Sequence, residues 1–288
     1  MQIRYSILPA ILLSACLFLA GCKGEKVPEG VPTPEPTADP MADVVQFALA
    51  EPLPAQEAPG LQENSQEQIA EEPRQVQIDP DRPMVALTFD DGPTPGVTDA
   101  ILDVLEHYGA RATFFVVGSR VPGNESILAR AVSLGCEIGC HTYNHDQLKG
   151  LTLEEGKKTI LETAQVVKDA CGYEIRSLRP PEGQNSDGIK EMALACNMAL
   201  VYWSHSTHDY RQDDWHVVAD YVQYDSDNGR ALKDGDIVLL HDLRSTTSDA
   251  METAIRTLTE QGYQLVTVQE LLNASEDGFA PGKSYKKK

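Results

Sequence analysis

Beyond residue 83 the chain alternates between short apolar runs and stretches whose apolar residues recur every three or four positions. The runs are typical of strands buried on both faces, and the periodic stretches are typical of amphipathic helices. This alternation predicts an α/β fold, a parallel sheet with right-handed crossovers. About seven strands suit a distorted, incomplete (β/α) barrel. The expected strands are 84–89, 112–117, 136–141, 177–179, 199–204, 236–241 and 263–268, and the expected helices are 98–108, 124–135, 152–171, 187–196, part of 216–225, 248–261 and 268–273.

The first expected strand ends abruptly in Asp90 and Asp91, which a Gly-Pro turn follows. Barrels and doubly wound sheets carry their chemistry at the carboxyl ends of their strands, so these carboxylates stand where a site would be built. Neighbouring side chains on an extended chain point in opposite directions and can serve different tasks. Asp-Asp-Gly alone is more often a solvated turn, so its interpretation depends on the residues downstream.

The first 22 residues differ from the rest in composition. An apolar run from Ile7 to Ala20 follows a positive start and is short for a membrane span, which is typical of a signal peptide. The run ends in Leu-Ala-Gly-Cys22, which resembles the bacterial lipoprotein signal; an ordinary secretory signal with a chance cysteine is the alternative. We expect acyl chains on Cys22 to hold the protein to the outer face of a cell membrane without a spanning helix.

Residues 23–83 are rich in Pro, Glu and Gln and poor in large apolar side chains. This composition predicts a disordered, extended linker that gives an anchored domain reach. A single folded domain then covers 84–273, and residues 274–288 are expected to form a flexible tail.

The formal net charge is -20 over 288 residues. It argues against a nucleic-acid partner, because the phosphates would repel the protein. We expect a monomer. Cys171 and Cys196 are a candidate disulfide pair, which export would permit, but buried free thiols are the default.

His141 and His145 follow the third expected strand, four residues apart. Two imidazoles at such a junction can be aimed at one point, and they suit a transition metal, zinc above all. His-x-x-x-His is weak evidence alone, because capping histidines are common. It gains force here because a carboxylate from the end of another strand would complete a trio of ligands.

Three further strand ends carry polar side chains. Arg179 precedes a rigid Pro-Pro turn and could pair with a carboxylate, although a surface arginine is the plainer interpretation. Asp209 and Tyr210 follow the fifth expected strand, and His241 ends the sixth. A histidine at the end of a buried strand can also be a core residue with satisfied hydrogen bonds.

Taken in order, these motifs resemble the polysaccharide deacetylase (NodB-homology) family of carbohydrate esterases. They are Thr-Phe-Asp-Asp-Gly-Pro, His-Thr-x-x-His, Arg-x-Pro-x-Gly, a Trp-Ser segment ending in Asp-Tyr, and Leu-Leu-His, spread over 84–273. Five motifs in the right order are specific, whereas any one alone is not. The resemblance implies a distorted seven-stranded (β/α) barrel that binds a divalent metal, usually zinc.

The resemblance also implies a role for each matching residue. Asp91, His141 and His145 match the family's metal ligands. Asp90 matches the general base, and Arg179 matches the arginine that pairs with it.

The remaining matches concern proton donation and substrate binding. His241 matches the general acid, and Asp209 matches the carboxylate that orients this histidine and raises its pKa. Leu239 matches the apolar wall of the acetyl pocket, and Tyr210 stands where a Trp usually lines the sugar groove. Glu182 occupies the position whose backbone N–H binds the oxyanion.

This chain departs from the family pattern at several positions. Glu182 replaces an aromatic residue, Ser206 replaces an Asp that would support Arg179, and Cys140 stands where Asn is usual. The implied reaction is metal-dependent removal of N-acetyl groups from an amino-sugar polymer. Location beside the cell wall favours peptidoglycan N-acetylglucosamine, with chitin-type oligomers and O-acetylated xylan still open. The departures leave an alternative, a surface glycan-binding module that keeps the metal but has little turnover.

Overall fold

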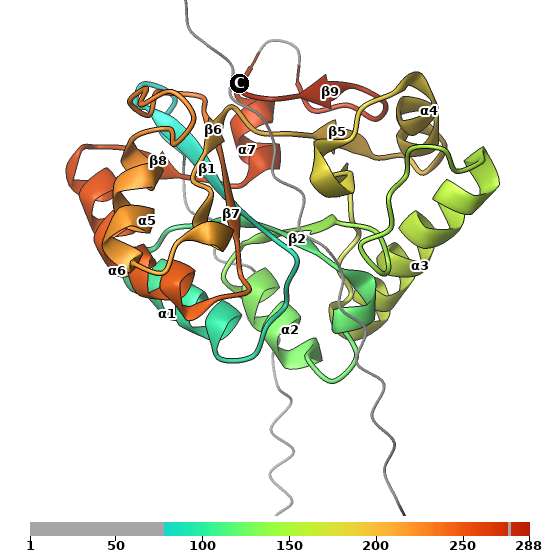
Figure 1. Ribbon diagram of the computed structural model, residues 1–288, viewed down its shortest axis with the longest axis horizontal. Coiled ribbons are helices and arrows are strands. Elements are labelled where there is room, and N and C mark those ends of the chain that lie inside the picture. Colours follow the sequence, from blue (N-terminus) through green and yellow to red (C-terminus); the bar gives the residue numbers. More distant parts are fainter. Residues whose placement is uncertain (1–77, 276–277) are drawn as a thin grey trace, which may run out of the picture. The chain divides into compact units, whose positions relative to one another are not determined.

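Within residues 78–275 and 278–288, which the computed structural model describes, nine short strands form one curled sheet (Figure 1). Every ladder between them is parallel. Their order is β6-β7-β1-β2-β3-β4-β5-β9, and β8 pairs with β1 off this path. The predicted parallel, incomplete barrel is therefore confirmed. The strands are β1 (Met84–Asp90), β2 (Thr113–Val116), β3 (Glu137–Cys140), β4 (Ser177–Leu178), β5 (Ala199–Val201), β6 (His205–Ser206), β7 (Ile237–His241), β8 (Gln264–Leu265) and β9 (Ser284–Tyr285).

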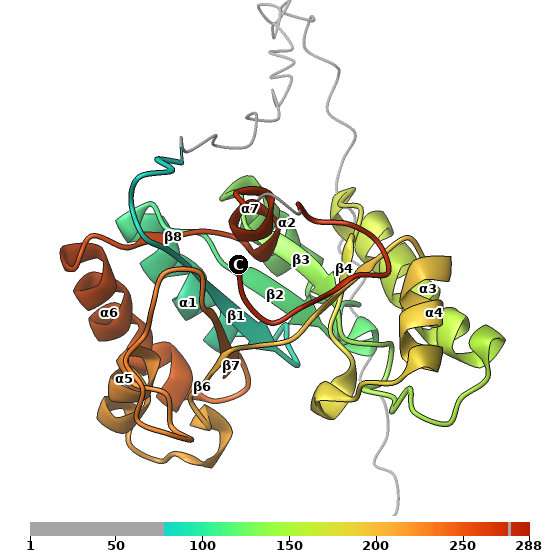
Figure 2. The ribbon, with the colours of Figure 1, turned by 90° about the horizontal axis from the view of Figure 1, so that it is seen from above.

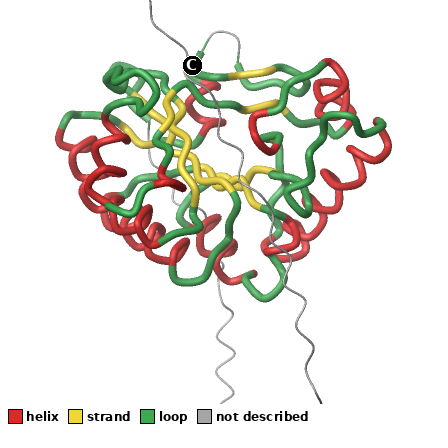
Figure 3. Tube along the Cα trace, viewed as in Figure 1, coloured by secondary structure: helices red, strands yellow, loops and turns green. Residues whose placement is uncertain are grey.

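Helices surround the central strands in Figure 3. Each expected helix is present within a few residues of its predicted bounds; the largest shift is in the sixth, which begins three residues early. The α-helices of the described chain are α1 (Val97–Tyr108), α2 (Glu125–Ser133), α3 (Leu153–Cys171), α4 (Asp187–Ala195), α5 (Trp215–Gln223), α6 (Ser245–Glu260) and α7 (Val268–Asn273). Three short 3-10 turns accompany them, η1 (Gly118–Arg120), η2 (Pro181–Gly183) and η3 (Asp209–Arg211).

The longest helix, α3, has clear start and stop signals in its sequence. The Thr152 hydroxyl accepts the Glu155 N–H while the Glu155 carboxylate accepts the Thr152 N–H, a reciprocal capping box. Gly172 then ends the helix in the left-handed conformation. These bonds satisfy backbone groups that the helix ends would leave unpaired.

The two faces of β1 meet different surroundings, although all seven of its residues are buried. Val85, Leu87 and Phe89 pack into the large cluster between sheet and helices. Met84 and Ala86 point the other way, into a smaller cluster that α7 fills with side chains such as Leu271. Because side chains alternate along a strand, Thr88 and Asp90 continue this inner face toward the carboxyl end. The inner face is thus apolar where α7 closes it and polar where the strand ends.

The expectation of a loose tail after residue 273 is wrong for the last residues. Strand β9 pairs with β5, and the Tyr202 N–H donates to the Tyr285 carbonyl at 2.8 Å. The Lys288 N–H donates to the Gly235 carbonyl at 2.9 Å, so the same segment also reaches the start of β7. Figure 2 shows this segment lying across the sheet. Its backbone pairing covers the edge of β5 that the other strands leave unpaired.

Four cysteines lie in the described part of the chain, and all are free thiols. The candidate pair Cys171–Cys196 is therefore not formed. The expected signal peptide, Cys22 and nearly all of the expected linker lie outside the described residues. Among the residues that are described, no helix is long and apolar enough to cross a membrane.

Candidate active site

The two adjacent carboxylates at the end of β1 diverge. Asp90 is the last residue of β1, whereas Asp91 adopts a left-handed backbone conformation with φ of 78°. This conformation is uncommon for a residue with a side chain, and such positions gather at functional sites. The next residue must be glycine, because a Cβ on Gly92 would lie 2.0 Å from Oδ2 of Asp242. The tight turn therefore directs Asp90 and Asp91 into different surroundings.

The two histidines come from the loop that follows β3. His141 is buried, and its Nδ1–H donates to the Arg179 carbonyl at 2.7 Å. A carbonyl can only accept, so this bond places the proton on Nδ1 and leaves Nε2 with its lone pair. Burial lowers the pKa of His141, against the opposing charges of Asp90 and Asp91, and so favours the neutral imidazole. A neutral ring with a free Nε2 is the form that binds a metal ion.

The third group, His145, meets the other two at one point. Its Nε2 lies 3.4 Å from Oδ1 of Asp91, and Nε2 of His141 lies 3.5 Å from the same oxygen. One ligand atom from each residue fits within a 4.8 Å cluster. Oδ1 of Asp91 is buried and has no hydrogen-bond partner, which is costly unless a cation satisfies it. These three side chains therefore fit a divalent metal ion.

Asp90 has a very different partner. Its Oδ1 accepts Nη1–H of Arg179 at 2.7 Å, and the Arg179 side chain is completely buried. Three of the other four guanidinium protons go to Thr88 Oγ1 and to the backbone carbonyls of Val201 and Tyr202. Oδ2 of Asp90 is left facing Nε2 of His141 at 3.9 Å. Arg179 thus fixes one oxygen of the Asp90 carboxylate and leaves the other directed at the Asp91–His141–His145 cluster.

A buried carboxylate holds His241 at the end of β7. Asp209 accepts Nδ1–H of His241 at 2.9 Å and its backbone N–H at 2.8 Å, and Thr247 donates to the same carboxylate. Burial lowers the pKa of His241, but the hydrogen bond and charge of Asp209 outweigh it and raise the pKa to about 9. His241 is therefore protonated at neutral pH.

One groove of about 550 Å³ is lined by Asp90, Asp91, His141, His145 and His241. Leu239 and Glu182 are also in its wall, and the Tyr210 ring lies edge-on to His241 with 5.2 Å between ring centroids. Asp209 lies behind His241 and Arg179 behind Asp90. The sequence-predicted set is therefore brought together at one mouth of the barrel.

Other groove residues escaped the sequence analysis. Trp203 lines the wall, and it packs so closely that a Cβ on Gly183 would lie 2.7 Å from its ring. His208 and Asp227, an ion pair at 3.2 Å, line the same groove. Trp203 stands in one of the quoted motifs, which could have identified it, whereas Asp227 lies in a loop with no such signal.

The departures from the family pattern leave the hydrogen bonds of Arg179 in place. Arg179 makes its hydrogen bonds without Ser206, whose backbone N–H donates to Asp225 instead. Glu182 has φ of 58° and accepts a hydrogen bond from the Gln147 side chain at 2.9 Å. Cys140 is buried among apolar side chains.

The fold and this set of strand-end residues define a class of protein. The profile of the polysaccharide deacetylase family matches residues 77–201. Peptidoglycan-N-acetylglucosamine deacetylase of Bacillus cereus is 37% identical over 196 residues, which are 66% of this chain and 88% of that protein. The chain therefore belongs to the polysaccharide deacetylase family.

Further relatives carry the same domain. Peptidoglycan-N-acetylmuramic acid deacetylase PdaC of Bacillus subtilis is 37% identical over 69% of this chain and 41% of that protein. Its solved structure, at 36% identity, superposes with a TM-score of 0.63 over 69% of this chain and 95% of the solved chain. A family 4 acetyl xylan esterase from Clostridium thermocellum, solved with a cobalt ion, gives a TM-score of 0.63 at 30% identity, covering 71% and 98%. The chain thus spans about two fifths of PdaC and most of several shorter relatives.

Proposed function

We propose that the protein is a metal-dependent hydrolase that removes N-acetyl groups from an amino-sugar polymer, with peptidoglycan N-acetylglucosamine as its substrate. The observation that carries the proposal is the Asp91–His141–His145 cluster, with its unpartnered Asp91 oxygen, in one groove with Asp90 and His241. The assignment of a role to each residue is part of this proposal. Hydrolysis of an amide needs a base, an acid and a site for the oxyanion, and the groove offers a candidate for each.

Asp91, His141 and His145 would hold the metal. A mixed nitrogen and oxygen donor set of this kind suits Zn²⁺. When bound, the ion supplies a Lewis acid that polarises a carbonyl and lowers the pKa of water.

The protein's own groups do the remaining work. Asp90 accepts the proton of the attacking water through Oδ2, because Arg179 occupies its Oδ1. The water oxygen bonds to the acetyl carbon, and the backbone N–H of Glu182 stabilises the oxyanion, a contact typically worth about 3 kcal/mol. His241 then donates its proton to the sugar nitrogen as the C–N bond breaks. The products are acetate and a free amino sugar.

Leu239, Trp203 and Tyr210 provide the apolar part of the binding groove. Leu239 and Trp203 line the wall where an acetyl methyl group would be buried. Tyr210, about two fifths exposed, offers a ring on which a sugar can stack.

The choice of peptidoglycan rests on location and on the names of the relatives. Deacetylases named for peptidoglycan are similar to this chain, and the sequence predicts a lipid anchor at Cys22 with a long linker. An anchored, outward-facing monomer with this reach would lie beside the cell wall. Zinc, the anchor and the monomeric state are parts of the same proposal.

Acetate release from a peptidoglycan glycan, with and without a chelator, tests the reaction. Activity should depend on the metal and fall sharply in His241→Ala, while mass spectrometry should find one acetyl mass lost for each amine formed. Tight glycan binding with no acetate from the metal-loaded protein would instead support the glycan-binding alternative. Unchanged release from His241→Ala would remove its role as the acid.

A further inference from the structure

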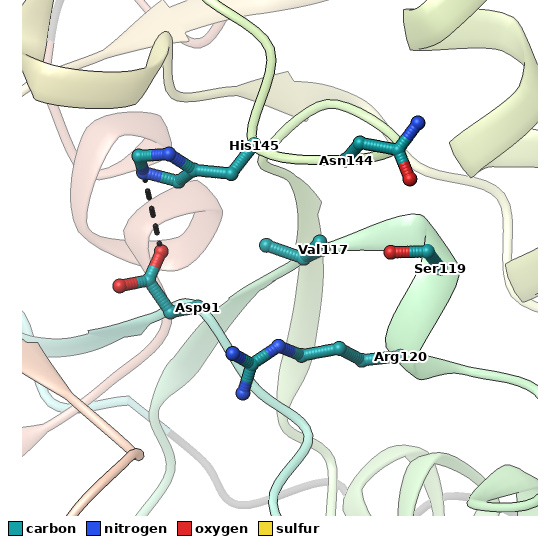
Figure 4. A pocket seen from close by; sticks show the side chains of 6 residues that line it. All are labelled: Asp91, Val117, Ser119, Arg120, Asn144 and His145. Atoms are coloured by element: carbon teal, nitrogen blue, oxygen red, sulfur yellow. Dashed lines mark ion pairs between the residues drawn. The ribbon is translucent and has the colours of Figure 1, made fainter. Parts of the chain in front are cut away.

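A second cavity, of about 410 Å³, adjoins the Asp91–His141–His145 cluster. It shares Asp91 and His145 with the groove described above, and Val117, Ser119, Arg120 and Asn144 complete its lining. Figure 4 shows the Arg120 side chain reaching back to lie below Asp91, with His145 above. A volume of this order suits part of a small ligand. A polymer bound across the metal cluster would therefore place a neighbouring unit near Arg120.

Three polar side chains in this cavity are not used by the fold. The Arg120 guanidinium, the Ser119 hydroxyl and the Asn144 amide make no hydrogen bond or ion pair with any described residue. All three side chains are exposed, and what sets Arg120 apart is its place in the cavity beside Asp91 and His145. Carboxylates pair with six other described arginines, Arg111, Arg130, Arg176, Arg179, Arg230 and Arg244, but with none of Arg82, Arg211 and Arg256.

The backbone next to Arg120 is tied to the loop that carries His141 and His145. Its 3-10 turn η1 is tied to the His145 loop by two backbone bonds, from Gly118 N–H to Thr142 at 3.0 Å and from Ser119 N–H to Tyr143 at 2.7 Å. A Cβ on Gly118 would lie 2.6 Å from the Tyr143 ring, so only glycine allows this approach. A guanidinium held on such a base can recognise a ligand with little loss of backbone freedom.

We propose that Arg120, assisted by Ser119 and Asn144, binds a carboxylate on the sugar next to the one that is deacetylated. A guanidinium is matched to a carboxylate through paired N–H bonds, whereas a neutral sugar offers it nothing comparable. The site would thus favour acidic glycans over chitin-type or xylan chains. In peptidoglycan the carboxylate could be the lactyl group of the neighbouring muramic unit or part of the peptide attached there. The inference rests on the proposed function, which supplies the position of the reacting sugar.

The experiment measures binding separately from turnover. Asp90→Asn keeps all three metal ligands and removes the proposed base, so calorimetry on this metal-loaded background reports dissociation constants without hydrolysis. The probes are chitotetraose, a peptide-free tetrasaccharide of alternating N-acetylglucosamine and N-acetylmuramic acid, the same sugar with its lactyl groups amidated, and the peptide-bearing form. Comparison of the last three identifies the source of the carboxylate.

Adding Arg120→Gln should lower the preference for acidic over neutral sugar by about 10-fold or more, the usual loss for a hydrogen bond to a charged group. Arg120→Lys should restore part of this preference. Arg176→Gln removes the same charge from an exposed side chain paired with Glu174, away from both cavities, and should leave the preference unchanged.

An equal loss of affinity for acidic and neutral sugars, or no loss for either, would overturn the assignment to Arg120. Acetate release by the unmutated protein is measured on the same sugars. If no sugar is hydrolysed but the acidic preference still depends on Arg120, the recognition site stands and the hydrolase proposal fails. If hydrolysis occurs but the preference for acidic sugar does not change in Arg120→Gln, the hydrolase proposal stands and the assignment to Arg120 fails.

Discussion

Asp90 and Asp91 are neighbours in sequence, yet the protein treats their carboxylates in opposite ways. Asp90 is 4% exposed, and its Oδ1 accepts a bond from a buried guanidinium that also donates to Thr88 and to two backbone carbonyls. Oδ1 of Asp91 is buried too, but it faces two imidazole nitrogens and accepts no hydrogen bond. The difference shows where the fold supplies the partner itself and where it leaves that task to a ligand.

The contrast also separates stability from function. The Asp90–Arg179 pair contributes to the integrity of the barrel interior, because either partner alone would be an unpaired buried charge. The Asp91 cluster is destabilising in the absence of a cation, because a buried oxygen lacks a partner. Substitutions on the two sides should therefore differ in their effects on activity, metal affinity and unfolding.

The largest expected effect is on catalysis. Asp90→Asn and Asp91→Asn should each lower kcat/KM by about 10³-fold or more, since one removes the proposed base and the other a proposed metal ligand. They should differ in metal content: Asp90→Asn retains its metal after dialysis and Asp91→Asn does not. Metal analysis beside an acetate assay checks this.

Equal metal loss in the two variants would show that Asp90 is itself a metal ligand. The two aspartates would then not differ in function as proposed. Lys190→Gln, on the exposed face of α4, serves as the control for handling and folding.

The next effect is on stability. Arg179→Met should lower the free energy of unfolding by about 3 to 5 kcal/mol, because Asp90 would remain buried without its cation. Urea unfolding followed by circular dichroism measures the change. Arg176→Met, at an exposed side chain of the preceding loop, should change it by less than about 1 kcal/mol. A small effect at Arg179 would mean that water reaches Asp90 and that the two aspartates are less different than their contacts indicate.

His241 makes the stability of the folded protein depend on pH. Its pKa is raised from the ordinary 6.5 to about 9, by Asp209 above all, after burial has acted in the opposite direction. The folded state therefore binds the proton more tightly than the unfolded state. The resulting stability, of order 3 kcal/mol, is fully present below pH 6.5 and is lost as the pH rises through about 9.

Unfolding measured from pH 6 to 10 in the metal-free protein tests this slope. His241→Gln should flatten it, and Asp209→Asn should move the remaining transition to lower pH. A slope that persists in His241→Gln would assign the alkaline loss to another group.

Much of the site could be predicted from sequence because strand ends are visible there. Residues such as His141 and His241 follow apolar runs directly, and parallel strands must present their ends at one mouth. The contacts that complete the site come from elsewhere. Thr247 reaches Asp209 from α6, and Thr88 reaches Arg179 from the inner face of β1. Neither contact has a spacing signal, because each depends on how the sheet curls.

The fold shows the same division. The long periodic segments were predicted well: α3, with its Thr152 cap, within one residue and α6 within three. The two-residue strands β6 and β9 were not predicted, because neither His205–Ser206 nor Ser284–Tyr285 lies in an apolar run. Strand β9 exists because β5 offers an unpaired edge, which is a tertiary cause.

Metal addition should raise the stability of the folded protein, and this gain should depend on the Asp91–His141–His145 cluster and not on Asp90. A cation that binds only the folded state stabilises it by about 2.7 kcal/mol at a concentration of 100 times its dissociation constant. Thermal unfolding of the unmutated protein with Zn²⁺, and again after chelation, measures this shift. His145→Gln should lose most of it, whereas Asp90→Asn should keep it. A shift retained in His145→Gln would place the ion elsewhere on this acidic chain.

The smallest effect is the most direct test of the contrast. In the metal-free protein Asp91→Asn should leave the free energy of unfolding unchanged or raise it by up to about 1 kcal/mol, because the amide replaces a charge that lacks a partner. Asp90→Asn should lower it under the same conditions, because the amide cannot balance the buried Arg179 charge. Urea titrations with a chelator present compare the two. If Asp91→Asn proves as destabilising as Asp90→Asn, the Asp91 carboxylate is satisfied without a metal, and its unpartnered oxygen is no longer evidence for an ion at this site.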